Sequence, residues 1–104
     1  MVVRISEKAY QQLAQVQIQG GRALRISAEF EGEGCACNLM YHLSVDVPSA
    51  EDIVSTAEVG VPVAMSRSTI EWVGEHASLD YLDNVGFVLA NPEQTLAYGV
   101  KFRK

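Results

Sequence analysis

Two cysteines, Cys35 and Cys37, are the residues whose type and spacing in this sequence could do chemistry. Glycines at positions 32 and 34 give the preceding backbone conformational freedom, and residues i and i+2 of an extended segment project to the same side. Both thiols can therefore face one metal ion. Soft thiolates suit zinc, copper(I) or an iron–sulfur cluster.

The number of thiols bears on how such a site would be completed. A tetrahedral zinc site or a [2Fe-2S] cluster usually takes four ligands, whereas each chain supplies two thiols. Two copies related by a two-fold axis would supply four, so we expect a metal site shared in a homodimer unless another group completes it. His42 and His76 are the candidates within the chain, although a lone surface histidine is often simply solvated.

Two other interpretations of the cysteine pair stay open. Cys35 and Cys37 could be small loop residues without a role, or they could form a redox pair, because a disulfide across one residue closes a strained and labile ring. Glu31 and Glu33 lie beside them, and like charge disfavours the thiolate. A freely reactive nucleophile is therefore less supported than a metal-bound thiolate.

The other polar residues form no catalytic constellation. The sequence has no Gly-x-Ser-x-Gly motif and no glycine-rich phosphate loop. Capping and solubility explain the carboxylates near the expected turns, which are Glu51, Asp52, Asp80 and Asp83. The aromatic residues expected to serve the core or an interface are Tyr10, Trp72, Tyr81 and Phe87.

The elements that must position the cysteines begin with a helix. Ser6 is a good N-cap for a helix that starts at Glu7 and is ended by Gly20 and Gly21. After it, apolar residues alternate with polar ones in two segments, 22–30 and 39–47, which predict two half-buried strands on either side of the cysteine loop.

The second half of the chain predicts further short elements. Residues 48–52 form a turn, and Val59 to Met65 alternate as a strand in which Pro62 indicates an edge or a bulge. Residues 68–71 resemble a capping box for a short helix that ends at Gly74. Strands near 79–81 and over 87–90 flank a turn at 83–86. Strands outnumber helices and do not alternate with them, so we expect a mainly β, α+β fold with flanking short helices: a distorted, mostly antiparallel β-sandwich or barrel.

Chain length, composition and net charge restrict the number of domains, the classes of binding partner and the location that we expect. The 104 residues suit a single domain over 1–104, and 48% hydrophobic residues suit a packed core. The net charge of −5 disfavours nucleic acid and anionic membranes as partners. No apolar run is long enough to cross a bilayer and the N-terminus lacks a secretion signal, so we expect a cytoplasmic protein.

Several segments in order resemble one known family over essentially the whole chain. They are Ala23–Ile26, Gly34-Cys35, Ser49–Val54, Gly60–Val63, Leu79–Tyr81, Val85–Phe87 and Asn91-Pro92. In type and spacing this set resembles the HesB/IscA family, the A-type iron–sulfur cluster assembly and carrier proteins. The resemblance implies a compact HesB-like β domain that associates into dimers or tetramers. It also implies a carrier, not an enzyme, that binds iron or an iron–sulfur cluster and exchanges it with donor and acceptor proteins.

The family's ligand positions can be carried over one at a time. Its loop cysteine matches Cys35, but its Cys-Gly-Cys motif falls on Tyr98, Gly99 and Val100. Neither Tyr98 nor Val100 supplies a thiol. Cys37 stands where many relatives have glycine, and it could replace a missing ligand. We therefore expect Cys35 and Cys37 to hold iron or a [2Fe-2S] cluster. The alternatives are an interaction module of the same fold that has lost metal binding, and a thiol redox or zinc-binding protein that uses the same pair.

Overall fold

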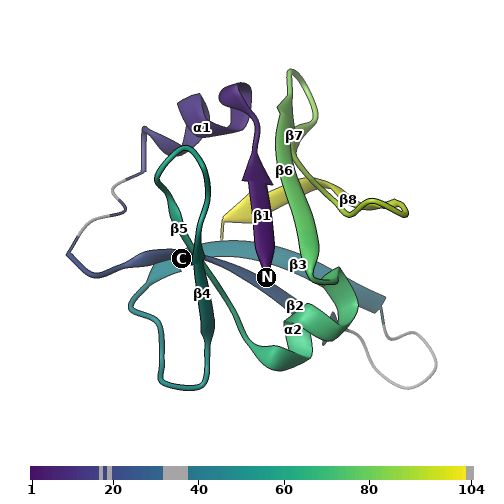
Figure 1. The fold of residues 1–104 in the computed structure, drawn as a ribbon. Helices are drawn as coiled ribbons and strands as arrows, with labels where there is room; N and C mark the ends of the chain where they lie inside the picture. Colours follow the sequence, from purple (N-terminus) through teal and green to yellow (C-terminus); the bar gives the residue numbers. More distant parts are fainter. Residues whose placement is uncertain (17, 19, 32–37, 103–104) are drawn as a thin grey trace.

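The structure is a computed structural model that describes residues 1–16, 18, 20–31 and 38–102. Cys35 and Cys37, the predicted ligands, lie outside the described residues. Within these described residues, ten elements follow one another (Figure 1). In order they are β1 (Val2–Ile5), α1 (Glu7–Leu13), β2 (Ala23–Glu31), β3 (Asn38–Asp46), β4 (Ile53–Thr56), β5 (Pro62–Met65), α2 (Arg67–Val73), β6 (His76–Leu82), β7 (Gly86–Ala90) and β8 (Thr95–Phe102).

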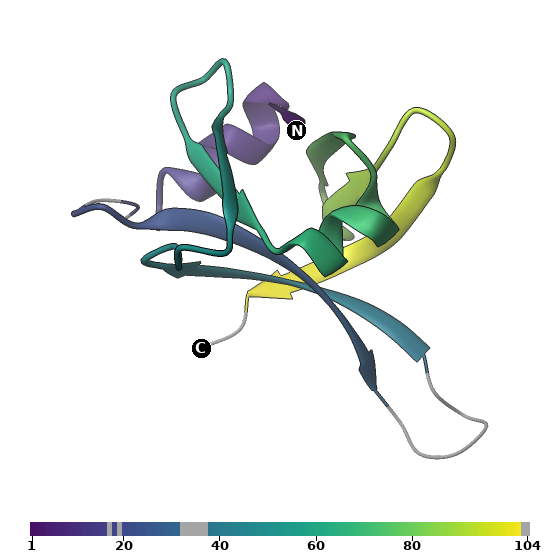
Figure 2. The same cartoon turned by 60° about the horizontal axis from the view of Figure 1, so that its bottom comes forward.

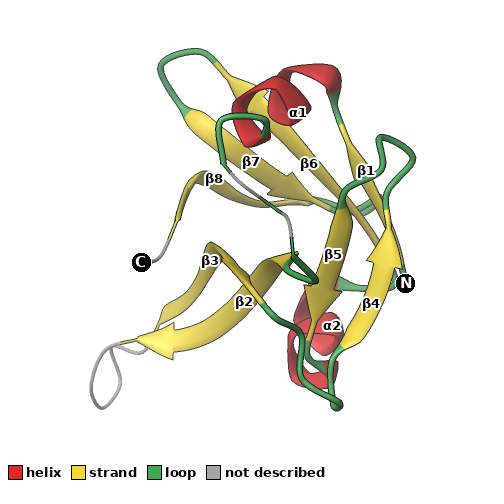
Figure 3. Cartoon of the chain, turned by 90° about the vertical axis from the view of Figure 1, so that its left-hand side faces the viewer, coloured by secondary structure: helices red, strands yellow, loops and turns green. Residues whose placement is uncertain are grey.

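The described strands form one mixed sheet in the order β1-β6-β7-β8-β3-β2-β5-β4. Neighbours pair in antiparallel fashion except for β1 with β6, β2 with β5, and β3 with β8, which are parallel. The sheet curves until its edge strands β1 and β4 lie near each other, which gives a nearly closed barrel (Figure 3). The prediction of a mainly β fold with two short helices is confirmed, although three of the pairings are parallel.

The core lies inside this curved sheet, and the helices pack against it. Helix α1 packs on β6 and α2 packs on β2. The largest fully buried side chains come from both helices and from β2, β3, β5, β6 and β7. They are Leu13, Leu24, Ile26, Leu43, Val63, Met65, Val73, Leu79 and Leu89. The alternating residues of the two long predicted strands thus supply the centre of the core.

Both helices have serine caps, but their bounds differ from the prediction. The Ser6 hydroxyl accepts a hydrogen bond from the Ala9 amide at 3.1 Å, as expected, yet α1 ends at Leu13, well before Gly20. The N-cap of α2 is Ser66, whose hydroxyl accepts from the Thr69 amide at 3.2 Å. The predicted capping box at 68–71 is therefore wrong by two residues, because Ser66, the residue after β5, already caps the helix.

The sequence predicts an edge strand or a bulge at Pro62, and this prediction is wrong. It is the first residue of β5, where it pairs with Thr56 of β4. Strand β5 lies between β2 and β4 rather than at an edge. The first position of a strand tolerates proline because the chain is only entering the hydrogen-bonded ladder there.

Strands β2 and β3 form a long hairpin whose outer end projects from the body (Figure 2). They pair over their full nine residues, from Ala23 opposite Asp46 to Glu31 opposite Asn38. Near the body, Leu24 and Ile26 are fully buried. At the outer end Phe30 is 59% exposed, so the predicted core face continues past the core into solvent.

Candidate functional site

The described hairpin fixes where the cysteine segment is attached. Glu31 and Asn38 are register partners at the outer ends of β2 and β3, so residues 32–37 connect two adjacent strand ends. Those ends lie away from the buried centre of the sheet (Figure 2). The expectation that both thiols face one metal ion stays a prediction, since it concerns residues outside the described part of the chain.

Strand β8 carries the positions of the family's other two cysteines, and it lies beside β3. The two strands are parallel, with His42 opposite Lys101 and Leu43 opposite Phe102. Because the two strands run in the same direction, the residues before Lys101 on β8 extend toward the same end of the sheet as the residues before His42 on β3. Tyr98 and Val100 therefore lie from this pairing toward the end of β3 that begins at Asn38, next to the cysteine segment.

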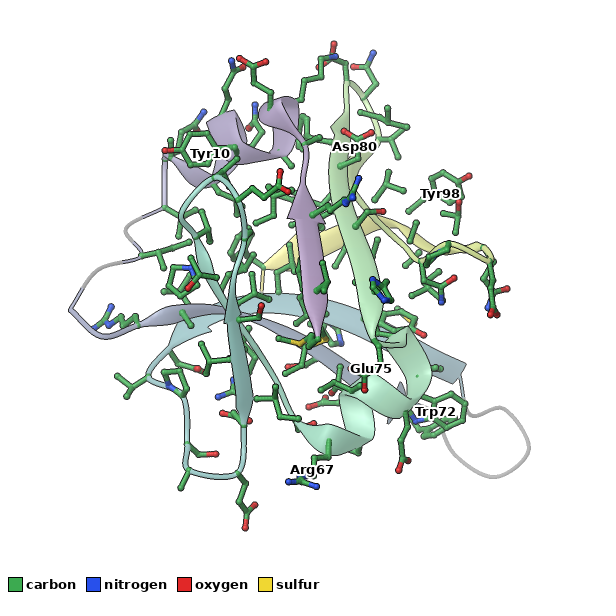
Figure 4. The ribbon with its side chains drawn as sticks, viewed as in Figure 1. Tyr10, Arg67, Trp72, Glu75, Asp80 and Tyr98 are labelled. Atoms are coloured by element: carbon green, nitrogen blue, oxygen red, sulfur yellow. The ribbon has the colours of Figure 1, made fainter. Side chains whose placement is uncertain are left out.

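Tyr98 and Val100 do not offer a pair of ligands there. Tyr98 is 65% exposed and stands at the molecular surface (Figure 4), whereas Val100 is 6% exposed and belongs to the core. Gly99 lies between them with a φ of +64°, at an irregularity in the pairing of β7 with β8. Since an alkyl side chain has no donor atom for a metal, Val100 contributes packing alone.

Gly99 is required by both its backbone and its surroundings. Its positive φ is a conformation that residues with a Cβ rarely adopt. A Cβ placed on it would lie 3.1 Å from the backbone oxygen of Val85, and one on Gly86 would lie 3.4 Å from the Cα of Gly99. A glycine at position 99 thus permits the close approach of β7 and β8.

The two histidines are not brought together. His42 is partly buried on β3 opposite Ser27, and His76 is exposed at the start of β6. Two strands, β7 and β8, separate β6 from β3 in the sheet. Within the described ranges, no group of three or more His, Cys, Asp or Glu residues could hold a metal ion.

One strong charged cluster was missed at the sequence level. Arg25 on β2 donates from its terminal nitrogens to both carboxylate oxygens of Asp52, at 2.9 and 2.5 Å, and from Nε to Asp46 at 2.9 Å. The Asp52 side chain is 4% exposed and also accepts from the Ser49 amide at 2.8 Å. The sequence explains Asp52 as a turn carboxylate, and nothing in the local pattern around Arg25, which lies on the polar side of an alternating strand, indicates this partner.

The electrostatics of this cluster are those of a structural clamp. The hydrogen bonds from Arg25 lower the pKa of Asp52 to about 2, against the opposing effect of burial. The same pairing raises the pKa of Arg25. Both groups stay charged at neutral pH, so they join β2 to β3 and to the turn before β4 rather than transfer protons.

Asp80 and Asn91, from two of the segments that resemble the family, form hydrogen bonds that connect elements of the fold. The Asp80 carboxylate accepts from the Ser6 hydroxyl at 2.6 Å and from the Tyr81 amide at 2.7 Å, and the hydrogen bond from Ser6 lowers the pKa of Asp80. The Asn91 side chain donates to the Val73 carbonyl at 2.9 Å and accepts from the amides of the following turn. These contacts tie α1 to β6, and the end of α2 to the β7–β8 turn.

Both described helices are too short to span a membrane.

Compared with known families, the sequence matches the iron-sulphur cluster biosynthesis family over residues 1–104. A search of curated proteins found no match.

Solved structures with a similar fold include three proteins of low sequence identity. A candidate Fe-S biosynthesis protein from Lactobacillus acidophilus matches with a TM-score of 0.74 and 17% identity, covering 98% of this chain and 88% of that one. A second, from Lactobacillus salivarius, matches with a TM-score of 0.73 and 13% identity, covering 99% and 97%. Escherichia coli SufA, a protein involved in the biosynthesis of iron–sulfur clusters, matches with 0.59 and 16%, covering 92% and 93%. At these identities the likeness concerns the fold.

Proposed function

The chain belongs to the iron-sulphur cluster biosynthesis family, and from this premise we propose that it binds iron or an iron–sulfur cluster as its cargo through Cys35 and Cys37. The cargo is then passed on by thiolate exchange between donor and acceptor proteins, so the protein is a carrier and not an enzyme. The family match over the whole chain carries this proposal. The Cys-x-Cys pair on the β2–β3 connection supports it.

A second copy of the chain completes the ligand set in this proposal. Each chain supplies two thiols, and a [2Fe-2S] cluster usually takes four. The positions of the family's other cysteines hold an exposed tyrosine and a core valine, so in this proposal the other two ligands come from a second chain. A symmetric homodimer supplies them most simply. Cysteines kept as free thiolates for metal exchange suit a reducing compartment, and we place the protein in the cytoplasm.

The test is anaerobic reconstitution with iron and sulfide. We expect about one iron and about one sulfide per chain, with the visible absorption of a [2Fe-2S] cluster. Cys35→Ser and Cys37→Ser should each abolish the cluster and leave the far-ultraviolet circular dichroism unchanged. Tyr98→Phe is the matched control, because it removes the only oxygen donor at the family's other ligand positions and should keep the full cluster.

The other outcomes identify the competing functions. A folded protein that takes up no iron would mean an interaction module that has lost metal binding, as the residues at 98 and 100 would allow. Bound zinc in native mass spectra of the purified protein would mean a zinc protein. A mass lower by two hydrogens would mean a disulfide and a redox role.

A further inference from the structure

Two aromatic side chains are exposed together beside the outer end of the hairpin. Phe30 on β2 and Trp72 on α2 are 59% and 48% exposed, and their ring centroids lie 5.3 Å apart in an edge-to-face arrangement. Leu39 is the register partner of Phe30 on β3, so its side chain lies on the same face. We call Phe30, Leu39 and Trp72 the aromatic patch. Large apolar side chains gathered at the surface typically mark a site of protein contact.

A groove of about 310 Å³ continues from Trp72 toward the β7–β8 turn. Its lining is acidic and includes Glu71, Trp72, Glu75, His76, Pro92 and Glu93. Glu75 lies 3.2 Å from the N-terminal amino group, and the side chains of Glu71 and Glu93 have no ion pair with a described residue. Lysine and arginine are absent from the described lining of the groove.

We propose that the aromatic patch and this groove dock a partner protein that presents lysine or arginine side chains around an apolar anchor. The anchor would pack on Phe30 and Trp72, and the cations would meet the groove's carboxylates, with Trp72 able to accept a cation on its ring face. A second copy of this chain is a poorer occupant, because it carries a net charge of −5 and would bring carboxylates toward carboxylates.

The position of the patch connects it with the proposed cargo. Phe30 immediately precedes Glu31, where the described strand meets the cysteine segment, and Trp72 lies beside this end of the hairpin (Figure 4). A partner seated there is adjacent to the ends of β2 and β3, the strands that the segment with Cys35 and Cys37 connects. The identification of this partner as the donor or acceptor of the cargo rests on the proposed function, whereas the docking surface itself does not.

Trp72 is the only tryptophan of the sequence, so its fluorescence reports on the patch directly. The metal-free chain is titrated with the synthetic peptide KRLKRLK, and with EDLEDLE as a probe of equal apolar content and opposite charge. We expect a saturable change in fluorescence with the basic peptide alone, which weakens as salt rises. Amide shifts in NMR spectra should gather at the outer end of β2, on α2 and in the β7–β8 turn.

Variants locate the binding. Phe30→Ala keeps the fluorophore and should weaken binding at least about fivefold, and the double variant Glu71→Gln, Glu93→Gln should do the same. A control of equal charge change, Glu7→Gln with Glu58→Gln, removes exposed carboxylates that do not line the groove and should bind as the unmodified chain does. Because these residues are exposed, the thermal unfolding midpoints should stay close together.

Four outcomes would overturn the proposal: no saturable change, equal binding of the acidic peptide, amide shifts centred elsewhere, or equal weakening by the control pair. If Phe30→Ala instead lowers self-association in sedimentation equilibrium and leaves peptide binding unchanged, the occupant is a second copy. The titration uses protein without iron, so its failure leaves the iron and sulfide counts of the proposed function untouched.

Discussion

The guanidinium of Arg25 and the carboxylate of Asp52 form a two-pronged ion pair between residues 27 positions apart in the chain. The pair joins the interior strand β2 to the turn that leads into edge strand β4. Each group is held by a further partner, Asp46 for the guanidinium and the Ser49 amide for the carboxylate. The hairpin that carries the cysteine segment is therefore anchored at its inner end by charge as well as by the core.

Removal of the negative charge of Asp52 should destabilise the fold. Asp52→Asn leaves the Arg25 guanidinium without its main partner, and we expect the free energy of unfolding to fall by about 2 kcal/mol. Urea denaturation followed by circular dichroism measures it. Asp83→Asn is the control, because Asp83 makes a single exposed ion pair with Lys8 at 3.3 Å, and its effect should stay below about 0.5 kcal/mol. Equal effects of the two substitutions would contradict a clamp.

The ion pair of Arg25 with Asp52 should make the free energy of unfolding depend on pH at acidic values. The pKa of Asp52 is lowered from 3.8 to about 2 in the folded protein, so its ion pair stabilises the fold above the unfolded pKa. This contribution is lost as the pH falls from about 4 toward about 2. The stability difference between the unmodified chain and Asp52→Asn should therefore be constant near neutral pH and shrink below about pH 4. Urea titrations at several pH values measure it, and a difference that stays constant into acid would refute the assignment.

Gly99 offers a test of the close approach between β7 and β8. Gly99→Ala introduces a Cβ at a φ of +64° and 3.1 Å from the Val85 oxygen, so it should cost about 2 kcal/mol of stability. Gly20→Ala has a similar φ of +69° but open space around it, and it should cost about 1 kcal/mol. The comparison by thermal or urea unfolding isolates the contact from the backbone strain. If the two substitutions cost the same, the contact with Val85 has no energetic weight.

The Ser6 hydroxyl serves two partners at once, since it accepts from the Ala9 amide and donates to Asp80. Ser6→Ala removes both contacts and should lower stability by about 1 to 2 kcal/mol. Ser6→Thr keeps a hydroxyl at the cap and should restore most of the loss. A threonine variant as unstable as the alanine variant would show that the serine acts through its size and not through these hydrogen bonds.

Local pattern was sufficient for the parts of the fold whose causes are local. The Ser6 cap, the alternation along β2 and β3, the stop at Gly74 and the turn at 83–86, where Asn84 has a φ of +68°, depend on neighbouring residues and were readable from the sequence. The order of short motifs likewise indicated the family, and the assignment of Cys35 and Cys37 as ligands comes from the sequence alone.

Only the tertiary structure decided how distant segments meet. Strands β1, β4 and β8 were missed: the first two have four residues each, too few for a period to show, and the pairing of β8 with β7 is irregular. The parallel pairing of β3 with β8, the burial of Asp52 against Arg25, and the separation of an exposed Tyr98 from a core Val100 all depend on partners far away in the chain. The local sequence determines which conformations a segment prefers, whereas the packing of the whole core determines which distant segments it contacts.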